Sequence, residues 1–516
     1  MQIHPLICAI IILLYKIGIN INWYTIFMLG MQFISFTIIG TIFVNKNKTF
    51  GILLYTSFIF IIYSKLLSYI QYTTVSMLCI ASGLILLIDS LKDIKVINKL
   101  KFVIAILMII IGCMIRFSTI IIALPFMVIY FICKLIKEKD IKVIKFALLL
   151  FIFIITVNIS FNLIYNINPT YREFLKFHDA RTYLHDYNWM NYSSNKEIFH
   201  NLGWSENDRD IFYAYCFGDE KVFNSNTLKS LEETALENRT DINLFQKILN
   251  TLNTYSNVIN NGIYEYIFLI TVLIVIFNNI FIILKNKNKK QDDALRVIFI
   301  NLILIAVLGM HCLFIFLNRP MFRVVISIYI IGVAMLMYIS FDNVKDISNK
   351  IIKNIFVILI LFISILEFKQ NVFSAKRYDI NNFSVYREIV EYTNENIENA
   401  YLYTLVMHDR FLAYSVYEKI IDNSYSNLRP LGDWDTYTEN YYVFKEKYGI
   451  DNLMESLYKN DNVYLISGDV IWGEKYKEYI NIIEKYIEDH YGIDVECNII
   501  KEFKNNIKIY KLKEKC

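Results

Sequence analysis

Long apolar segments dominate this chain and restrict it to folds that lie in a membrane. They fall at residues 4–19, 22–44, 50–66, 70–90, 101–115, 117–136, 143–164, 263–284, 295–317, 321–341 and 350–369. A helix needs about 20 consecutive apolar residues to cross a bilayer. The pattern therefore predicts an α-helical polytopic membrane protein with 10–11 transmembrane segments. The lower number applies if the short first segment lies along the membrane surface.

The loops between these segments alternate between lysine-rich and lysine-poor, which sets the expected topology. Lysine clusters follow every second segment, at residues 46–48, 92–101, 134–142, 285–290 and 345–353. Loops rich in lysine and arginine remain on the cytoplasmic side of a membrane. We therefore expect the other loops, and both large polar regions, to face outward.

Two polar regions divide the chain into four parts. These are a first transmembrane block (1–164), an extracytoplasmic and mainly helical loop domain (165–261), a second transmembrane block (262–370) and a C-terminal extracytoplasmic domain (371–516). In the loop domain, Ser205 and Asp208 have the spacing of a helix-capping box. The C-terminal domain alternates strand-like and helix-like runs, which predicts a small α/β domain. Its expected elements are strands near 400–406 and 462–467, helices near 384–396 and 474–489, and a strand pair within 495–512.

The composition argues against several classes of function. The net charge is only +4, and no basic patch interleaved with aromatic residues is present, so we expect no nucleic-acid partner. The eight cysteines are scattered and show no metal-ligand or disulfide spacing. The C-terminal domain has no glycine-rich phosphate loop and no Ser-His-Asp order. We therefore expect neither a metal nor a cofactor.

Three arginines lie near the outer face, where the topology rule predicts few basic residues. Arg116 separates two short segments that share residues 101–136, which holds it at the rim of the bilayer. Arg319 and Arg323 lie at a later outer turn, and a helix beginning at Pro320 would place Arg323 one turn in. Guanidinium groups bind phosphate bidentately. Together the three arginines predict a site for a lipid-linked phosphate, or else they reach ordinary phospholipid headgroups.

Carboxylates suited to act as a general base are hard to find outside the predicted cytoplasmic loops. We expect any outward base to come from the two polar regions. Asp186, which has aromatic neighbours, and Asp208, which lies in a tight turn, are the weak catalytic candidates. Most carboxylates of this kind are simply solvated. In the C-terminal domain, the stretch 427–435 is either a structural turn or a sugar-binding loop with Trp434 as a stacking platform.

Several of these motifs resemble those of the C-type (GT-C) membrane glycosyltransferases. His4-Pro5 opens an apolar stretch and Asn22-Trp23-Tyr24 leads into a long one, which is similar to the end of the first outer loop in that superfamily. The outer turns at Arg116 and Arg319–Arg323, and a soluble domain after the last span, also fit. The resemblance implies a bacterial plasma-membrane enzyme that uses a polyprenyl-phosphate-linked sugar and acts on an acceptor glycan or lipid.

Three further motifs resemble a narrower group, the uncharacterised Firmicutes membrane proteins. They are Arg181-Thr-Tyr-Leu-His-Asp186, Leu202-Gly-Trp-Ser-Glu-Asn-Asp208 and Gly432-Asp-Trp434. Within these motifs we expect Arg181, Trp204 and Trp434 to be sugar or acceptor contacts.

The sequence departs from the superfamily at its start and therefore leaves more than one function open. The superfamily places its catalytic acid in a first outer loop after a first span, and both are missing before residue 4. Either the start is truncated, or the chain is a partner or remnant that lacks catalysis. The first hypothesis is a glycosyltransferase-like protein. The second is a non-catalytic membrane component or a degenerate enzyme of an envelope-glycan assembly. A transporter ranks last, because the apolar segments lack paired carboxylates and broken helix pairs.

Overall fold

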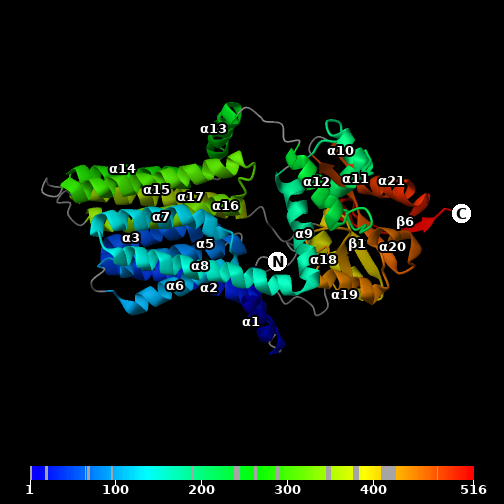
Figure 1. The fold of residues 1–516 in the computed structure, drawn as a ribbon, viewed down its shortest axis with the longest axis horizontal. Helices are drawn as coiled ribbons and strands as arrows, with labels where there is room; N and C mark the ends of the chain where they lie inside the picture. The colour runs from blue at the N-terminus through cyan, green and yellow to red at the C-terminus, as the bar shows by residue number, and fades with distance from the viewer. Residues whose placement is uncertain are drawn as a thin grey trace. The chain divides into compact units, whose positions relative to one another are not determined.

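The structure, a computed structural model, divides the chain into two compact units (Figure 1). It describes residues 3–17, 21–63, 65–66, 70–93, 97–187, 190–237, 244–260, 264–284, 290–344, 350–375, 383–407, 426–472 and 475–515. The first unit comprises Met1–Asn162 and Ile242–Arg377, and the second comprises Leu163–Asp241 and Tyr378–Cys516. Each unit is therefore assembled from two separate stretches of the chain.

The first unit is a bundle of helices. They are α1 (Pro5–Lys16), α2 (Trp23–Lys46), α3 (Lys48–Phe58), the π-helix η1 (Ile59–Tyr63), α5 (Tyr72–Ser90), α6 (Lys99–Ile115), α7 (Thr119–Glu138), α8 (Ile141–Ile167), α13 (Leu244–Asn260), α14 (Glu265–Leu284), α15 (Lys290–Phe316), α16 (Phe322–Val344) and α17 (Lys350–Ala375). Among the described residues, eight helices are long and apolar enough to cross a membrane, namely α2, α5, α7, α8 and α14–α17. They indicate a multi-pass membrane protein. The predicted segments 4–19, 50–66 and 101–115 form the shorter helices α1, α3 with η1, and α6, which explains the difference from 10–11 spans.

Helices α5 and α16 form the most buried part of this bundle and run in the same direction. Their apolar windows are each 89% buried, against 22% for α8. The Tyr338 hydroxyl, late in α16, donates to an Asp89 carboxylate oxygen, late in α5, at 3.2 Å. The two helices therefore begin at the same end. Helix α6 ends there too, because the Ser76 hydroxyl of α5 donates to the Arg116 carbonyl at 3.3 Å. We call this the arginine end of the bundle.

Two glycines allow α5 and α6 to pack closely. A Cβ atom on Gly83 would meet the Ala105 carbonyl oxygen at 2.8 Å, and one on Gly112 would meet the Ser76 carbonyl oxygen at 2.8 Å. Small residues at such positions let membrane helices approach backbone to backbone. The close contact fixes where α6 ends, and so fixes the position of Arg116.

The second unit combines helices with a five-stranded sheet. The loop region supplies α9 (Pro169–Thr182), the π-helix η2 (Tyr183–Tyr187), α10 (Lys196–Asn201), α11 (Glu206–Tyr213) and α12 (Ser225–Glu237). The C-terminal region supplies α18 (Ser384–Glu395), β1 (Ala400–Tyr403), η5 (Leu405–Met407), β2 (Leu428–Pro430), α19 (Glu439–Tyr448), α20 (Leu453–Lys459), β3 (Val463–Ser467), β4 (Asp469–Trp472), β5 (Lys475–Glu478), α21 (Tyr479–Tyr491), β6 (Val495–Glu502), η7 (Lys504–Asn506) and β7 (Lys508–Glu514). The sheet order is β2-β1-β3-β7-β6. Strand β1 pairs in parallel with β2 and β3, whereas β7 is antiparallel to β3 and β6.

One hydrophobic core joins the loop region to the C-terminal region. Buried residues from both stretches belong to it, including Phe177 and Phe212 from the loop, and Tyr401, Leu465 and Ile483 from the C-terminal part. The sequence analysis treats 165–261 and 371–516 as separate domains, whereas the structure packs most of both into one unit. Helix α13, at the end of the loop region, belongs to the first unit instead.

Candidate functional site

Arg181 and Trp434, predicted from the sequence as sugar contacts, lie against each other in the second unit. The guanidinium carbon of Arg181 is 3.9 Å from the centre of the Trp434 ring. Arg181, in the last turn of α9, is 0% exposed, whereas Trp434, in the turn after β2, is 40% exposed. A buried cation therefore supports an aromatic ring that remains open to solvent.

Several protein groups, including the hydrogen-bonding side chain of Tyr215, hold the Arg181 guanidinium. Its Nη2 atom donates to the Thr182 hydroxyl at 3.0 Å and lies 3.4 Å from His178 Nδ1. Its Nη1 atom is buried and has no hydrogen-bond partner among the residues that the structure describes. A buried donor left without an acceptor costs about 1–3 kcal/mol. Because Arg181 is fully buried, its part in the site is to support the Trp434 ring.

Two carboxylates and a tyrosine surround this guanidinium. Burial lowers the pKa of Arg181, and the nearby Tyr215, Asp186 and Asp433 oppose that change. Asp186 is half-buried in η2, and Asp433 is half-buried next to Trp434. Tyr215 has a left-handed backbone with φ 57°, which is uncommon outside glycine and often marks a functional turn. Asp433 lies inside the Gly432-Asp-Trp434 motif but was not selected as a site residue, and Tyr215 had no sequence signal, because it joins the site only through tertiary packing.

The π-helix η2 positions the polar residues that follow α9. Single π-helical turns inside or after α-helices are frequent at functional sites. The turn carries Asp186 and also His185, whose ring lies 4.3 Å from Tyr215 and 4.5 Å from Phe212, centre to centre. Burial lowers the pKa of His185 well below its usual 6.5, and the charge of Arg181 lowers it further. His185 is therefore neutral at physiological pH.

The arrangement matches the chemistry of carbohydrate recognition. An exposed indole offers a flat apolar surface for the C–H face of a sugar ring. The half-buried carboxylates of Asp186 and Asp433, which act on the same guanidinium, could accept hydrogen bonds from hydroxyl groups, in the usual pattern of an apolar surface with a few polar groups.

Trp204, the third predicted sugar contact, lies in the core instead. It is 2% exposed, and its ring centre lies 5.0 Å from that of Phe223 and 5.5 Å from that of Phe212. The cause is the tight turn at Gly203, φ 73°, which directs the next residue inward. Trp204 therefore contributes to packing and cannot touch a ligand at the surface.

Asp208, one of the two predicted catalytic acids, is held by structural contacts. Its carboxylate accepts from the Ser205 amide at 2.6 Å and completes the predicted capping box at the start of α11, which is confirmed. The other oxygen lies 2.6 Å from Nε2 of His490 on α21. Asp208 is 1% exposed, so it joins α11 to α21 and is not placed to act as a base.

The Asp208–His490 pair predicts a pH-dependent stability. The hydrogen bond to Asp208 raises the pKa of His490 above its usual 6.5, and this outweighs burial, which lowers it. A raised folded-state pKa means that the pair stabilises fully below about pH 6.5 and that the stabilisation is lost as pH rises through the raised value. The urea midpoint of the wild type, followed by tryptophan fluorescence from pH 5.5 to 8.5, should fall relative to that of His490→Gln. If the urea midpoints of the two proteins change with pH in the same way, the pair contributes nothing to the pH dependence of stability.

The three predicted phosphate-binding arginines lie at the arginine end of the first unit. Arg116 follows α6, and its guanidinium donates to Ser118 at 2.9 Å and to Thr73 at 2.5 Å. Helix α16 begins at Phe322 and not at Pro320, so Arg319 precedes the helix and Arg323 is its second residue. The Nε atom of Arg323 is buried without a hydrogen-bond partner among the described residues.

The structure adds a buried charge pair that the sequence analysis overlooked. Glu367, inside the spanning helix α17, has an oxygen 2.5 Å from the ammonium of Lys65. The prediction from sequence drew its candidate carboxylates only from the two polar regions, whereas Glu367 lies inside the predicted apolar segment 350–369. The signal was present, because each residue is a charge within a predicted apolar segment, at 350–369 and 50–66.

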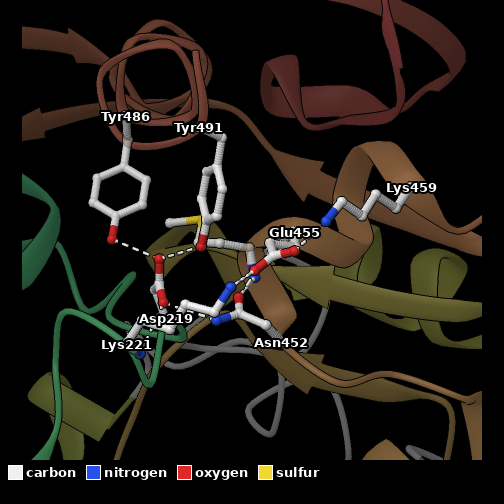
Figure 2. Close-up of polar contacts among 8 residues, drawn as sticks. Asp219, Lys221, Asn452, Glu455, Lys459, Tyr486 and Tyr491 are labelled. Atoms are coloured by element: carbon white, nitrogen blue, oxygen red, sulfur yellow. Dashed lines mark hydrogen bonds and ion pairs between the residues drawn. The ribbon is translucent and has the colours of Figure 1, made fainter. Parts of the chain in front are cut away.

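A second buried carboxylate, Asp219, fastens the loop region to the C-terminal region (Figure 2). It accepts from the hydroxyls of Tyr486 at 2.9 Å and Tyr491 at 2.5 Å, and from the Asn452 amide at 2.7 Å. The Lys221 backbone amide donates to it at 3.0 Å. Each of these donors satisfies a lone pair, so Asp219 is a structural group with no capacity left for a substrate.

Comparisons with known proteins find no matching family model, no matching curated protein and no matching solved structure. Within the described part of the chain, no group of three His, Cys, Asp or Glu residues is placed to hold a metal ion. The function is therefore inferred from the geometry of the Arg181–Trp434 site and of the arginine end.

Proposed function

We propose that this chain is a glycosyltransferase-like protein of the bacterial plasma membrane that handles a polyprenyl-phosphate-linked sugar at the outer face. Its role would be to modify a cell-envelope polysaccharide or glycolipid. The observation that carries the proposal is the buried Arg181 beneath the exposed Trp434, flanked by Asp186 and Asp433. In this proposal, the second unit holds the acceptor glycan and the first unit holds the lipid-linked donor.

The glycan part of the proposal follows from the accessibility of Trp434. A ring that is 40% exposed has room for a sugar to stack on it. Arg181 holds the ring from below, which limits the side-chain entropy lost on binding. Asp433 precedes Trp434 in the chain, and Asp186 acts on the same guanidinium; both are half-buried. In this proposal their carboxylates accept hydrogen bonds from sugar hydroxyls, and Asp186 is the remaining predicted acid.

The donor part follows from the charges at the arginine end. Arg116, Arg319 and Arg323 lie where three helices begin or end, as expected for residues at a membrane surface. Guanidinium groups pair strongly with phosphate oxygens. A polyprenyl phosphate has its tail in the bilayer and its headgroup at this depth, so it matches both the apolar helices and the charges. In this proposal, membrane lipid surrounds the first unit, and one class of membrane lipid is its ligand.

Replacing Arg319 by Ala should weaken the binding of a polyprenyl phosphate about tenfold or more, because a charge-assisted contact to phosphate is lost. The test is a titration of the detergent-solubilised full chain, with Arg172→Ala as a control, since Arg172 is an exposed arginine of α9. The variant should retain the thermal unfolding midpoint of the wild type. An unchanged Kd would rule out Arg319 as a donor contact.

A non-catalytic component of an envelope-glycan assembly is the second candidate. It is favoured by the commitment of Asp208 to α11 and His490, which removes one of the two predicted bases. Such a protein would bind both glycan and lipid-linked sugar but transfer nothing. Incubating the full chain with the lipid-linked sugar and an envelope glycan, and looking for the glycosylated product, separates the two functions.

A further inference from the structure

The buried Lys65–Glu367 pair has no part in the function proposed above. Lys65 follows the π-helix η1 and is 3% exposed, and Glu367 on α17 is 0% exposed. Their charged atoms are 2.5 Å apart. Ionisable side chains inside membrane-spanning helices are expensive, and they mark functional sites by default. The pair therefore requires an explanation beyond helix packing.

The pair is a costly way to stabilise a bundle. Lys65 and Asn371 are the side chains that hydrogen-bond to the Glu367 carboxylate among the described residues, which leaves it with fewer donors than its lone pairs can accept. A buried ion pair offsets the desolvation of its charges only when further hydrogen bonds satisfy the remaining lone pairs. A pair of apolar residues of the same size would stabilise the bundle as well or better. Its benefit is therefore expected in binding.

Lys65 lies close to the start of α16. Its ammonium is 5.8 Å from the ring centre of Phe322, the first residue of that helix. The second residue is Arg323, whose buried Nε has no hydrogen-bond partner among the residues that the structure describes. The first backbone N–H groups of a helix lack intrahelical partners and attract anions. The Lys65 ammonium, held by the Glu367 carboxylate, therefore lies near a helix start that also carries a guanidinium group.

We propose that Lys65, Arg323 and the start of α16 form the anion site that receives the phosphate of a lipid-linked ligand, with Glu367 as the counter-ion that holds Lys65 until the phosphate binds. This inference rests on the proposed function and adds two residues to its donor site. On binding, the ammonium exchanges a carboxylate partner for a phosphate partner, and no covalent bond changes. Phe322 is half-buried and would turn aside to admit the headgroup.

The exchange predicts that replacing Glu367 and replacing Lys65 change the affinity for the lipid phosphate in opposite directions. Glu367→Gln removes the competing carboxylate and should bind a polyprenyl monophosphate about tenfold more tightly than the wild type. Lys65→Met should bind it about tenfold more weakly. Because Lys65→Met leaves Glu367 buried without its cation, the double variant Lys65→Met/Glu367→Gln is the safer test. It should bind at least about tenfold more weakly than Glu367→Gln alone.

The experiment measures the Kd of the detergent-solubilised full chain for polyprenyl monophosphate, with polyprenyl alcohol and inorganic phosphate as separate probes. Lys369→Met, on the exposed face of the same helix, is the matched control and should leave the Kd unchanged. Equal binding of the alcohol would overturn recognition of the anion. Equal binding of inorganic phosphate would assign the site to free phosphate and overturn the lipid ligand.

The failure of this inference can be told apart from the failure of the proposed function. If the wild type does not bind polyprenyl monophosphate at all, the donor role of the whole bundle is wrong. If the wild type binds and Arg319→Ala weakens binding, but Glu367→Gln and the double variant leave the Kd unchanged, only the role of the pair is wrong. Lower unfolding midpoints with an unchanged Kd would assign the pair to structure alone.

Discussion

Replacing Asp219 by Ala should destabilise the second unit by about 3–5 kcal/mol, the usual cost of breaking a buried, fully hydrogen-bonded charge site. The carboxylate is 0% exposed and accepts from Tyr486, Tyr491, Asn452 and the Lys221 amide. Alanine would leave these donors without an acceptor and would loosen the attachment of the loop region to α20 and α21. Figure 2 shows how the donors converge on the one carboxylate.

The measurement is urea unfolding of the full chain in detergent, followed by tryptophan fluorescence. Four of the five tryptophans lie in the second unit, at positions 189, 204, 434 and 472, so the signal reports mainly on that unit. Asp489→Asn on α21 is the control, because Asp489 is exposed and its replacement should change the free energy of unfolding by less than about 0.5 kcal/mol. A similarly small effect of Asp219→Ala would show that the loop region is held mainly by its apolar core.

Replacing Arg181 by Met should abolish glycan binding and destabilise the second unit by about 3 kcal/mol. The first effect follows from the loss of the support beneath Trp434. The second follows because Asp186 and Asp433 would lose the cation that acts on both of them. Binding would be measured with a panel of envelope oligosaccharides and the full chain, alongside its unfolding midpoint.

A second variant separates binding from stability at this position. Arg181→Lys keeps the charge but loses the planar group that stacks on the indole, and the two cations are not interchangeable at stacked sites. It should lose less stability than Arg181→Met and still bind glycan at least about tenfold more weakly. Tyr442→Ala removes another exposed aromatic ring of the same unit, 37% exposed, and serves as the control. Normal glycan binding by Arg181→Lys would reduce Arg181 to a structural role.

The regular elements of the fold were largely predictable because local pattern and tertiary structure agree. The strands at 400–406 and 462–467 appear as β1 and β3, the helices as α18 and α21, and the closing pair as β6 and β7. Hydrophobic periodicity and capping residues distinguish helices from strands and locate their ends to within a few residues. The shared core of the loop and C-terminal regions was not predictable. The apolar residues of each region indicate that the region has a buried face, but they do not indicate that the other region packs against it.

The candidate site was predictable only in part, for a similar reason. Arg181, Asp186 and Trp434 were selected from local motifs, and the structure brings them together. Trp204 came from the same kind of motif but lies in the core, because a motif does not specify which way a side chain points. Glu367 was overlooked because one acid at the end of a long apolar segment resembles the start of the following polar region.

The most direct test of the central claim is native mass spectrometry of the full chain purified from the membrane in which it is produced. The account predicts a bound lipid with the mass of a polyprenyl phosphate carrying one or more sugar residues. It also predicts that Arg319→Ala loses this lipid, whereas Arg172→Ala retains it. Wild-type protein that carries only ordinary phospholipids, or a polyprenyl adduct unchanged in Arg319→Ala, would contradict the claim that this bundle holds a lipid-linked sugar by its phosphate.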